Sequence, residues 1–337
     1  MSRVLRPAFL PLSLTLIAVA FVTVPLPVFL EQPGRTVSLA EQVTVGTPEA
    51  EPVSGDFLLT AVNLERATLA RALYGWLDDD ISMVPAELVI PQGMRDDSYF
   101  DVQRELFAST ADVAAAVGLA AAGYDVDPTA VTGDGARVVQ VLDGAPADGA
   151  LEVSDVIVAV DDRRIRTSRD LLDAVSGADA PDGVRTFGVV RGDQDIDLQL
   201  TPRPLTEATP QIGVQTETVD PRIDLPFEVQ VDTGSVGGPS AGLLIGLTVL
   251  DIADADRDLA AGRVVAGTGT LEPDGAVGQI GGVPQKVAAA LREEAEVFLV
   301  PSGQVAQARG AVPDGTDLVV IGVETFDQAV AELGGRR

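Results

Sequence analysis

The chain has 337 residues, and its 51 acidic residues outnumber its 23 basic residues, which gives a formal net charge of −28. This charge argues against binding to nucleic acids and against docking of a basic patch on anionic lipid, because both require clustered cations. The sequence has no histidine and no cysteine, so it excludes Ser-His-Asp, Cys-His and thiol chemistry, and zinc sites built from these residues.

The N-terminal segment carries a long apolar run. Two arginines precede the run, which extends from Ala8 to Leu30, and an acidic residue follows it. This length is enough to cross a bilayer, and positive charge at the N-terminal side predicts an N-terminus inside the cell. We expect residues 1–31 to form a single-pass transmembrane helix in the cell membrane, with the rest of the chain outside the cytoplasm. A signal peptide cleaved near Ala18–Ala20 is the alternative.

The next two segments differ in composition. Residues 32–54 are polar, acidic and contain proline, which is typical of a linker beside a membrane. Within residues 55–126 the pattern predicts an apolar strand, a helix and an Ala-rich helix. These expected elements are Phe57–Val62, Leu64–Trp76 and Ser109–Ala122.

Residues 128–203 have the pattern of short strands separated by turns. The expected elements are two strands, a helix and a hairpin: Arg137–Val141, Val156–Val160, Arg169–Val175, and Thr186–Arg191 with Asp195–Leu200. The segment GAPADGALEVSDVIVAVDDRRI, residues 144–165, resembles a bacterial-type PDZ domain. One departure is Ser154, which stands where that family usually has glycine.

The PDZ resemblance implies a small β-sandwich or barrel that captures peptides by adding a strand at a sheet edge beside a helix. We expect the groove to lie between the strand Arg137–Val141 and the helix that follows. Val138, Val139 and Leu172 are the expected peptide-binding residues. A spacer domain that binds nothing is the alternative.

The last segment, residues 208–335, mixes strands and helices, which indicates an α/β or α+β fold. The expected strands are Glu228–Val231, Arg263–Ala266, Val297–Val300 and Leu318–Ile321, and the expected helices are Ser240–Ile252, Pro284–Glu294 and Phe326–Leu333. Acidic residues at positions 254, 256 and 258 have the spacing of a calcium loop. They lack its glycine and distal glutamate, so we expect a solvated loop and no metal.

A serine follows a glycine-rich stretch in this segment. The sequence from Gly237 to Gly242 is GGPSAG, and it places Ser240 at the start of a helix. The free N–H groups and the positive dipole end of that helix would face the Ser240 hydroxyl, a suitable place for a developing oxyanion. An N-cap serine without a catalytic role is the structural alternative.

Lys286 is the only lysine, and the other 22 basic residues are arginine. A guanidinium is effectively never deprotonated in a protein, so this lysine is the remaining candidate base for a serine. It follows the glycine-rich turn Gly278–Gly282 and has apolar neighbours such as Val283 and Val287. Desolvation there would lower the amine pKa. The alternatives are a coding bias that spared one lysine and a surface lysine on an amphipathic helix.

Two segments together resemble the proteolytic domain of Lon-type proteases, which use a Ser-Lys dyad. They are GSVGGPSAGLLIG, residues 234–246, and VVAGTGTLEPDGAVGQIGGVPQKVAAAL, residues 264–291. The resemblance covers about 120 residues. It implies that Ser240 is the nucleophile, that Lys286 is the base, and that Thr268 supports the lysine. Backbone N–H groups at Gly238 and Ala241 would then stabilise the oxyanion.

Two residues depart from the pattern that is usual in Lon enzymes. Gly237 stands where many Lon enzymes have aspartate, and Thr270 stands where many have glutamate. Both changes recur in the membrane-anchored, PDZ-containing Lon-like branch, which this chain resembles over its whole length. The resemblance implies an α+β Lon-type proteolytic domain with a PDZ domain inserted between Ala122 and Ile212, and one N-terminal transmembrane helix.

Lon enzymes proper carry an ATPase, whose Walker A loop needs Gly-Lys-Ser/Thr. Here the only lysine lies between Gln285 and Val287, so we expect neither ATP nor another cofactor. The expected function is ATP-independent endopeptidase cleavage of unfolded or exposed peptide segments. A catalytically inactive Lon-like scaffold that binds peptides through its PDZ domain is the alternative. Lon-type domains often form hexameric rings, so a homo-oligomer is expected by resemblance.

Overall fold

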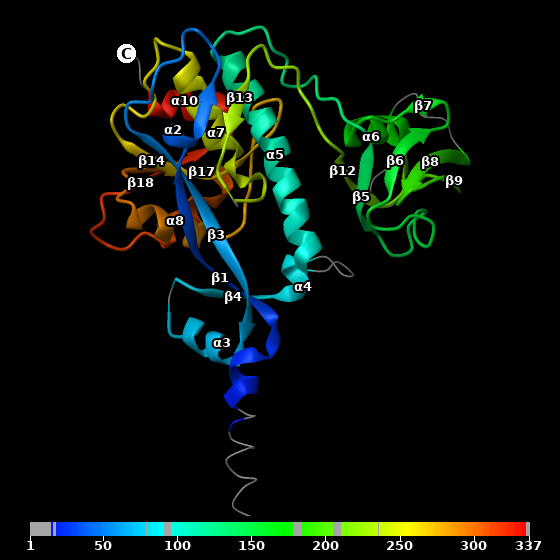
Figure 1. Ribbon diagram of the computed structural model, residues 1–337, viewed down its shortest axis with the longest axis horizontal. Coiled ribbons are helices and arrows are strands. Elements are labelled where there is room, and N and C mark those ends of the chain that lie inside the picture. Colours follow the sequence, from blue (N-terminus) through cyan, green and yellow to red (C-terminus); the bar gives the residue numbers. More distant parts are fainter. Residues whose placement is uncertain are drawn as a thin grey trace, which may run out of the picture. The chain divides into compact units, whose positions relative to one another are not determined.

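The structure is a computed structural model (Figure 1). It describes residues 15, 18–78, 80–90, 96–177, 183–204, 210–234 and 236–334. The chain divides into two compact units. Unit 1 comprises Met1–Val126 and Leu225–Arg337, and unit 2 comprises Asp127–Asp224. Unit 1 is therefore discontinuous in sequence, with unit 2 between its two segments.

Unit 1 is built on a mixed sheet with the strand order β18-β17-β14-β3-β1-β4. β14, β17 and β18 are parallel to one another and to β3, whereas β1 is antiparallel to both β3 and β4. The strands are β1 (Pro25–Ser38), β3 (Asp56–Thr68), β4 (Ser82–Pro85), β14 (Val264–Gly267), β17 (Val297–Pro301) and β18 (Val319–Val323). The central parallel strands are short apolar runs, as expected for strands that are covered on both faces.

Helices cover both faces of this sheet. Alternate residues of a strand point to opposite faces. Phe57 and Leu59 therefore join one core cluster with α5 (Asp96–Ala121) and α7 (Gly242–Ala253), while Leu58 joins another with α8 (Val283–Arg292). Every residue of α7 is buried. The two glycines Gly118 and Gly246 let α5 and α7 approach closely, because a Cβ at Gly118 would lie 2.6 Å from the Gly246 carbonyl oxygen.

Short elements connect these layers. They are α2 (Leu39–Gln42), β2 (Val43–Val45), α3 (Leu69–Gly75), α4 (Ala86–Val89), β13 (Val229–Val231), η1 (Pro239–Ala241), β15 (Thr270–Leu271), β16 (Val277–Gly278), η2 (Ser302–Gln304), α9 (Val305–Gly310) and α10 (Phe326–Leu333). β2 pairs with β13, and β15 pairs with β16. The β2–β13 ribbon joins the two sequence segments of unit 1, whereas the β15–β16 ribbon lies within the second segment and shapes the loop before α8.

Unit 2 is an antiparallel sheet with the order β12-β5-β6-β8-β9, and one helix packs beside it. Its elements are β5 (Ala136–Val141), β6 (Val156–Val160), β7 (Arg163–Arg164), α6 (Ser168–Ser176), β8 (Arg185–Arg191), β9 (Gln194–Leu200), β10 (Arg203–Pro204), β11 (Pro210–Gln211) and β12 (Val214–Thr218). α6 begins with a capping box, in which Thr167 and Asp170 satisfy each other's backbone N–H groups. Val138, Ile157, Phe187 and other apolar side chains form a separate core.

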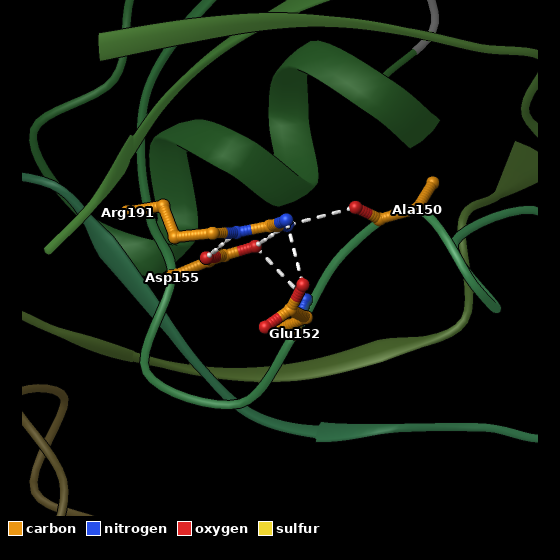
Figure 2. A network of polar contacts seen from close by, with 4 residues as sticks. All are labelled: Ala150, Glu152, Asp155 and Arg191. Atoms are coloured by element: carbon orange, nitrogen blue, oxygen red, sulfur yellow. Dashed lines mark hydrogen bonds and ion pairs between the residues drawn. The ribbon is translucent and has the colours of Figure 1, made fainter. Parts of the chain in front are cut away.

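One polar network closes the turn before β6 (Figure 2). Both carboxylate oxygens of Asp155, a side chain that is 1% exposed, accept hydrogen bonds from Arg191, at 2.8 and 2.7 Å. Arg191 also contacts Glu152 and the Ala150 carbonyl, and the Glu152 N–H donates to Asp155. The turn holds Ser154 at a φ of 78°, in the left-handed region that favours glycine. This explains physically why a glycine is usual at that position.

The structure corrects two expectations about the N-terminal part. Residues 32–54 are not a linker, because they contain the second half of β1 together with α2 and β2. The expected helix over residues 1–31 cannot extend to its end, because β1 begins at Pro25 and pairs with β3 and β4. Most of the expected anchor, residues 1–14, 16 and 17, lies outside the described residues. Over the part of the chain that is described, no helix combines the length and apolarity needed to span a membrane.

Two further boundaries differ from the expectations. The segment Leu64–Trp76 is not one helix, because β3 continues to Thr68 and α3 begins at Leu69. Pairing along the long β1 ladder overrides the helical spacing of these residues. Unit 2 extends to Asp224 instead of ending at residue 203, because β12 returns to its sheet beside β5.

Candidate active site

Ser240 lies in η1, at the entrance to the buried helix α7. The chain reaches it through Gly238, whose φ of 87° favours glycine, and then through Pro239 at the first helical position. A Cβ at Gly242 would lie 2.9 Å from the Leu271 backbone nitrogen, so the turn after Ser240 also needs glycine. The glycine-rich sequence therefore allows the serine to lie between α7 and β15.

Lys286 projects from the first turns of α8 towards this serine. Its Nζ atom lies 2.6 Å from Ser240 Oγ and 2.9 Å from Thr268 Oγ1. α8 starts after Gly282, which has a φ of 66° and on which a Cβ would collide with Val62. This close approach of the turn to β3 lets the lysine reach inwards. Three side chains from three sequence regions thus meet at one point.

Burial controls the charge of this lysine. Lys286 is only 3% exposed, and burial lowers its pKa from 10.5 to about 7. Its hydrogen-bonding partners in the described part of the chain are two hydroxyl groups, not carboxylates. An amine without a counter-ion in a dry environment releases its proton more readily, so a large fraction of Lys286 is neutral near pH 7.

Thr268 fixes the direction of the amine. Its hydroxyl, which is fully buried, donates to the Ser240 carbonyl oxygen at 3.1 Å. The Thr268 hydroxyl proton is used in this hydrogen bond, so towards Lys286 Nζ the hydroxyl oxygen can act only as an acceptor. The lone pair of a neutral Lys286 is then left to accept the proton of Ser240 Oγ. The Gly269 N–H also donates to the Ser240 carbonyl, at 3.0 Å, so the serine backbone is held by two bonds.

Of the two predicted oxyanion donors, the Ala241 N–H is placed to serve this role and the Gly238 N–H is not. The Gly238 N–H already donates to the Gln103 carbonyl of α5, at 2.7 Å, so the prediction for Gly238 needs correction. Ala241 is buried in the first turn of the η1–α7 helix, where N–H groups have no partner within the helix. The sequence had no signal for the role of Gln103, because its contact comes from the packing of α5 against η1.

A cavity of about 980 Å³ opens beside Ser240 and Lys286. β1 and β3 line one side, α5 contributes Tyr99 and Phe100, and the Gly281–Gly282 turn lines another side. β4 pairs with β1 only from Val28 to Glu31. Within the described residues, the part of β1 after Glu31 has no strand paired on the side that β4 occupies. The cavity is thus large enough for an extended peptide and is bordered by an open strand edge.

The expected peptide groove of unit 2 needs a correction. β5 lies between β12 and β6 and is not an edge strand, because β12 pairs along its length and β6 pairs with it at Ala136 and Arg137. Val138 is fully buried, Val139 is half-buried, and Leu172 of α6 is 51% exposed. The strand edge beside α6 belongs to β12. The alternation of Val214, Thr216 and Thr218 was a strand signal that could have identified this edge from the sequence.

Family models match both units. A model of the C-terminal proteolytic domain of Lon protease (S16) matches residues 214–333, and a PDZ domain model matches residues 116–201. The boundary between the two matches falls before β12, whereas the structure keeps β12 in the sheet of unit 2. No curated protein matches the chain.

Solved PDZ domains are similar to part of the chain. Crystal structures of the PDZ domain of the SdrC-like protein from Listeria innocua and from Listeria monocytogenes are each 23% identical, with TM-scores of 0.23, and cover 25% of this chain and 93% and 90% of their own. A solution structure from Geobacillus thermodenitrificans is 27% identical over 22% of this chain and 83% of its own, with a TM-score of 0.20. Scores this low carry no argument about the fold. The two family models, however, show that the chain joins a PDZ domain to a Lon-type (S16) proteolytic domain, as in a PDZ-containing Lon-like protease.

Proposed function

We propose that this chain is a membrane-anchored, ATP-independent serine endopeptidase that uses Ser240 and Lys286 as a catalytic dyad. The observation that carries the proposal is the distance of 2.6 Å between Ser240 Oγ and the Lys286 amine, whose pKa is lowered to about 7 by burial. A general base with a pKa near the working pH is the arrangement that proton transfer favours. The substrates are unfolded or exposed polypeptide segments, which fit the open cavity beside the dyad.

The proposed reaction has two halves. Neutral Lys286 takes the Ser240 hydroxyl proton as Oγ attacks the scissile carbonyl, and the Ala241 N–H stabilises the negative charge on the carbonyl oxygen. Lys286 then gives the proton to the leaving amine. In the second half, Lys286 takes a proton from water as the water oxygen attacks the acyl carbonyl. Lys286 then returns this proton to Ser240 Oγ as the bond between Oγ and the acyl carbon breaks and the acid product leaves. Thr268 keeps the amine pointed at Oγ throughout.

Independence from ATP is proposed because the chain has a single lysine, and this lysine contacts Ser240. A phosphate-binding Walker loop needs a lysine of its own. No other side chain in the sequence can take that place, since arginine does not fit the motif. Cleavage without a motor suits substrates that are already unfolded.

The PDZ domain is proposed to capture peptides at the edge of β12 beside α6, not at β5. Membrane attachment is proposed from the apolar run that starts at Ala8, shortened by the start of β1 at Pro25. The two arginines before the run favour an N-terminus inside the cell, with both units outside the cytoplasm. A ring-shaped homo-oligomer, such as a hexamer, is proposed from the resemblance to Lon alone.

The test compares the full-length protein in detergent with Ser240→Ala and Lys286→Arg, using an unfolded protein as substrate and no nucleotide. We expect wild-type cleavage and a loss of about 10³-fold or more in each variant, because members of a catalytic unit are jointly required. Residues before β1 can be removed for a soluble version, but a chain that starts at Gly34 would lack all of the β1–β4 pairing. Activity that survives Lys286→Arg would contradict the lysine-base mechanism. An inactive wild type that still binds peptides would favour the scaffold alternative.

A further inference from the structure

α3 presents an unusual group of exposed apolar side chains. Exposure ranges from 49% at Leu69 to 73% at Leu77, and Trp76 is 72% exposed. We define the α3 patch by its five large side chains: Leu69, Leu73, Tyr74, Trp76 and Leu77. The opposite side of α3 faces the protein, because a Cβ at Gly75 would lie 3.0 Å from Ile81 and 3.3 Å from Leu30. The helix is therefore packed on one side and uncovered on the other.

The patch lies where the N-terminal apolar run enters unit 1. Pro25, the first residue of β1, pairs with Thr68, the last residue of β3, and α3 begins at the next residue. Figure 1 shows α3 at the same end of unit 1 as the start of β1. The residues just before β1 are exposed and apolar too, with Val22 at 57% and Val24 at 51%. The patch is thus continuous with the segment proposed to enter the membrane.

The composition of the patch suits a lipid interface. Tryptophan and tyrosine are enriched where a protein meets the headgroup region of a bilayer. The whole chain has one tryptophan and three tyrosines, and two of these four residues, Tyr74 and Trp76, belong to the patch. Such side chains place an apolar ring against the acyl chains and a polar group towards water.

Two arginines around the patch are already in ion pairs. Arg71 forms an ion pair with Glu65, and Arg292 forms one with Asp80 at 2.9 Å. With a net charge of −28, the chain has no excess of cations to attract anionic headgroups. Contact with a bilayer would therefore depend on the apolar side chains, and neutral lipids would be sufficient.

We propose that the α3 patch inserts into the headgroup region of the membrane and docks unit 1 on the bilayer surface. This inference rests on the proposed membrane anchor. Docking through α3 adds a second point of attachment to the single anchor. It would fix the orientation of the β1–β3 ribbon, and with it the active-site cavity that this ribbon lines, relative to the lipid surface.

Trp76 is a built-in reporter, because the chain has no other tryptophan. The full chain is placed in phosphatidylcholine vesicles whose acyl chains are brominated near the headgroup, and in matched vesicles without bromine. We expect a roughly twofold loss of Trp76 emission in the brominated vesicles, since interfacial aromatic rings lie at the headgroup level. The control is Trp76→Phe combined with Val319→Trp, which moves the reporter to β18 at the opposite edge of the sheet. We expect no quenching there.

Flotation of the same vesicles separates the possible failures. Protein that floats but shows no quenching of Trp76 would overturn the docking of α3 and leave the anchor in place. Protein that does not float would overturn both. Unquenched Trp76 with cross-linking of α3 to a second copy would show that the patch is an interface between chains instead. Leu73→Asp with Leu77→Asp should abolish quenching and leave peptidase activity in detergent unchanged, because neither side chain lines the active-site cavity.

Discussion

Both units bury ionisable side chains, and two of these, Asp155 in unit 2 and Lys286 in unit 1, have opposite surroundings. In unit 2, the buried Asp155 has a guanidinium partner in Arg191 and a backbone N–H donor. In unit 1, the buried Lys286 has two hydroxyl partners and, within the described residues, no ion pair to stabilise its ammonium form. A paired charge persists and holds a turn in place, whereas an unpaired amine gives up its proton and becomes a base.

The comparison predicts that the lysine costs stability and the Asp155–Arg191 pair does not. Replacement of Lys286 by an apolar side chain of similar length should therefore stabilise unit 1 while it removes activity. Removal of Arg191 should destabilise unit 2, because it would leave the Asp155 carboxylate buried without a cationic partner.

The first experiment is Lys286→Met. Between pH 7 and 10.5 the unfolded wild type binds a proton that the folded chain does not, so wild-type stability rises with pH across this window. Below about pH 7 the variant should be more stable by on the order of 5 kcal/mol. This advantage should shrink by about 1.4 kcal/mol per pH unit above that. Urea unfolding at several pH values measures it, and Ser240→Ala, which keeps the lysine, should show the wild-type pH dependence. A difference that is independent of pH would refute the account.

The second experiment is Arg191→Met in unit 2. Removal of Arg191 leaves the carboxylate of Asp155, which is only 1% exposed, buried without its guanidinium partner, so unit 2 should lose stability. Thermal unfolding of unit 2, followed by calorimetry, should shift to lower temperature. Arg169→Met is the matched control, because Arg169 is 80% exposed in its pair with Asp173 and should matter little. Equal effects in the two variants would remove the contrast between buried and exposed pairs.

Thr268→Val tests whether the hydroxyl orients the lysine. The substitution keeps the shape of the side chain and removes both of its hydrogen bonds, so we expect roughly a 10- to 100-fold loss in kcat, with little change in KM. Thr268→Ser retains the hydroxyl and should recover most of the activity. A loss that Thr268→Ser shares in full would point to packing instead of orientation.

Ser154→Gly carries the smallest expected effect. Ser154 has a φ of 78°, and relief of this left-handed strain should stabilise unit 2 by about 1 kcal/mol. Asp161 at a φ of 52° is a comparison position, but there the carboxylate accepts the Thr186 N–H. Asp161→Gly should therefore bring no gain. Lower thermal stability of Ser154→Gly would show that the serine side chain contributes to the turn.

Much of the architecture could be predicted from the sequence where local pattern and packing agree. The buried strands at 297–300 and 318–321 and the helices after Ser240 and around Lys286 are all present. The pattern did not predict β1, whose segment was divided between an anchor and a linker. Its proline and polar residues hide a strand that exists because of its long ladder with β3. The helix expected at Leu64 failed for the same reason.

The site shows the same division between local and long-range information. Ser240 and Lys286 were identifiable because each has a local motif, and Thr268 because of its position in the Lon-like segment. Gly238 was misassigned because its N–H is taken by the Gln103 carbonyl, a residue 135 positions earlier in the sequence. The peptide edge of unit 2 was placed on β5 because the return of β12 to the sheet is a matter of topology. Such contacts cannot be inferred from one local stretch.

The titration of Lys286 shows whether its amine is neutral or charged in the folded protein. The chain has one lysine, so labelling lysine with 13C at Cε gives a single resonance that needs no assignment. The chemical shift of this carbon reports the protonation of Nζ as the pH is varied on the folded protein. The account predicts a midpoint at about pH 7, with the neutral amine above it. A midpoint near the ordinary lysine value of 10.5 would mean that the amine stays charged in the folded protein, and it would contradict the assignment of Lys286 as the base.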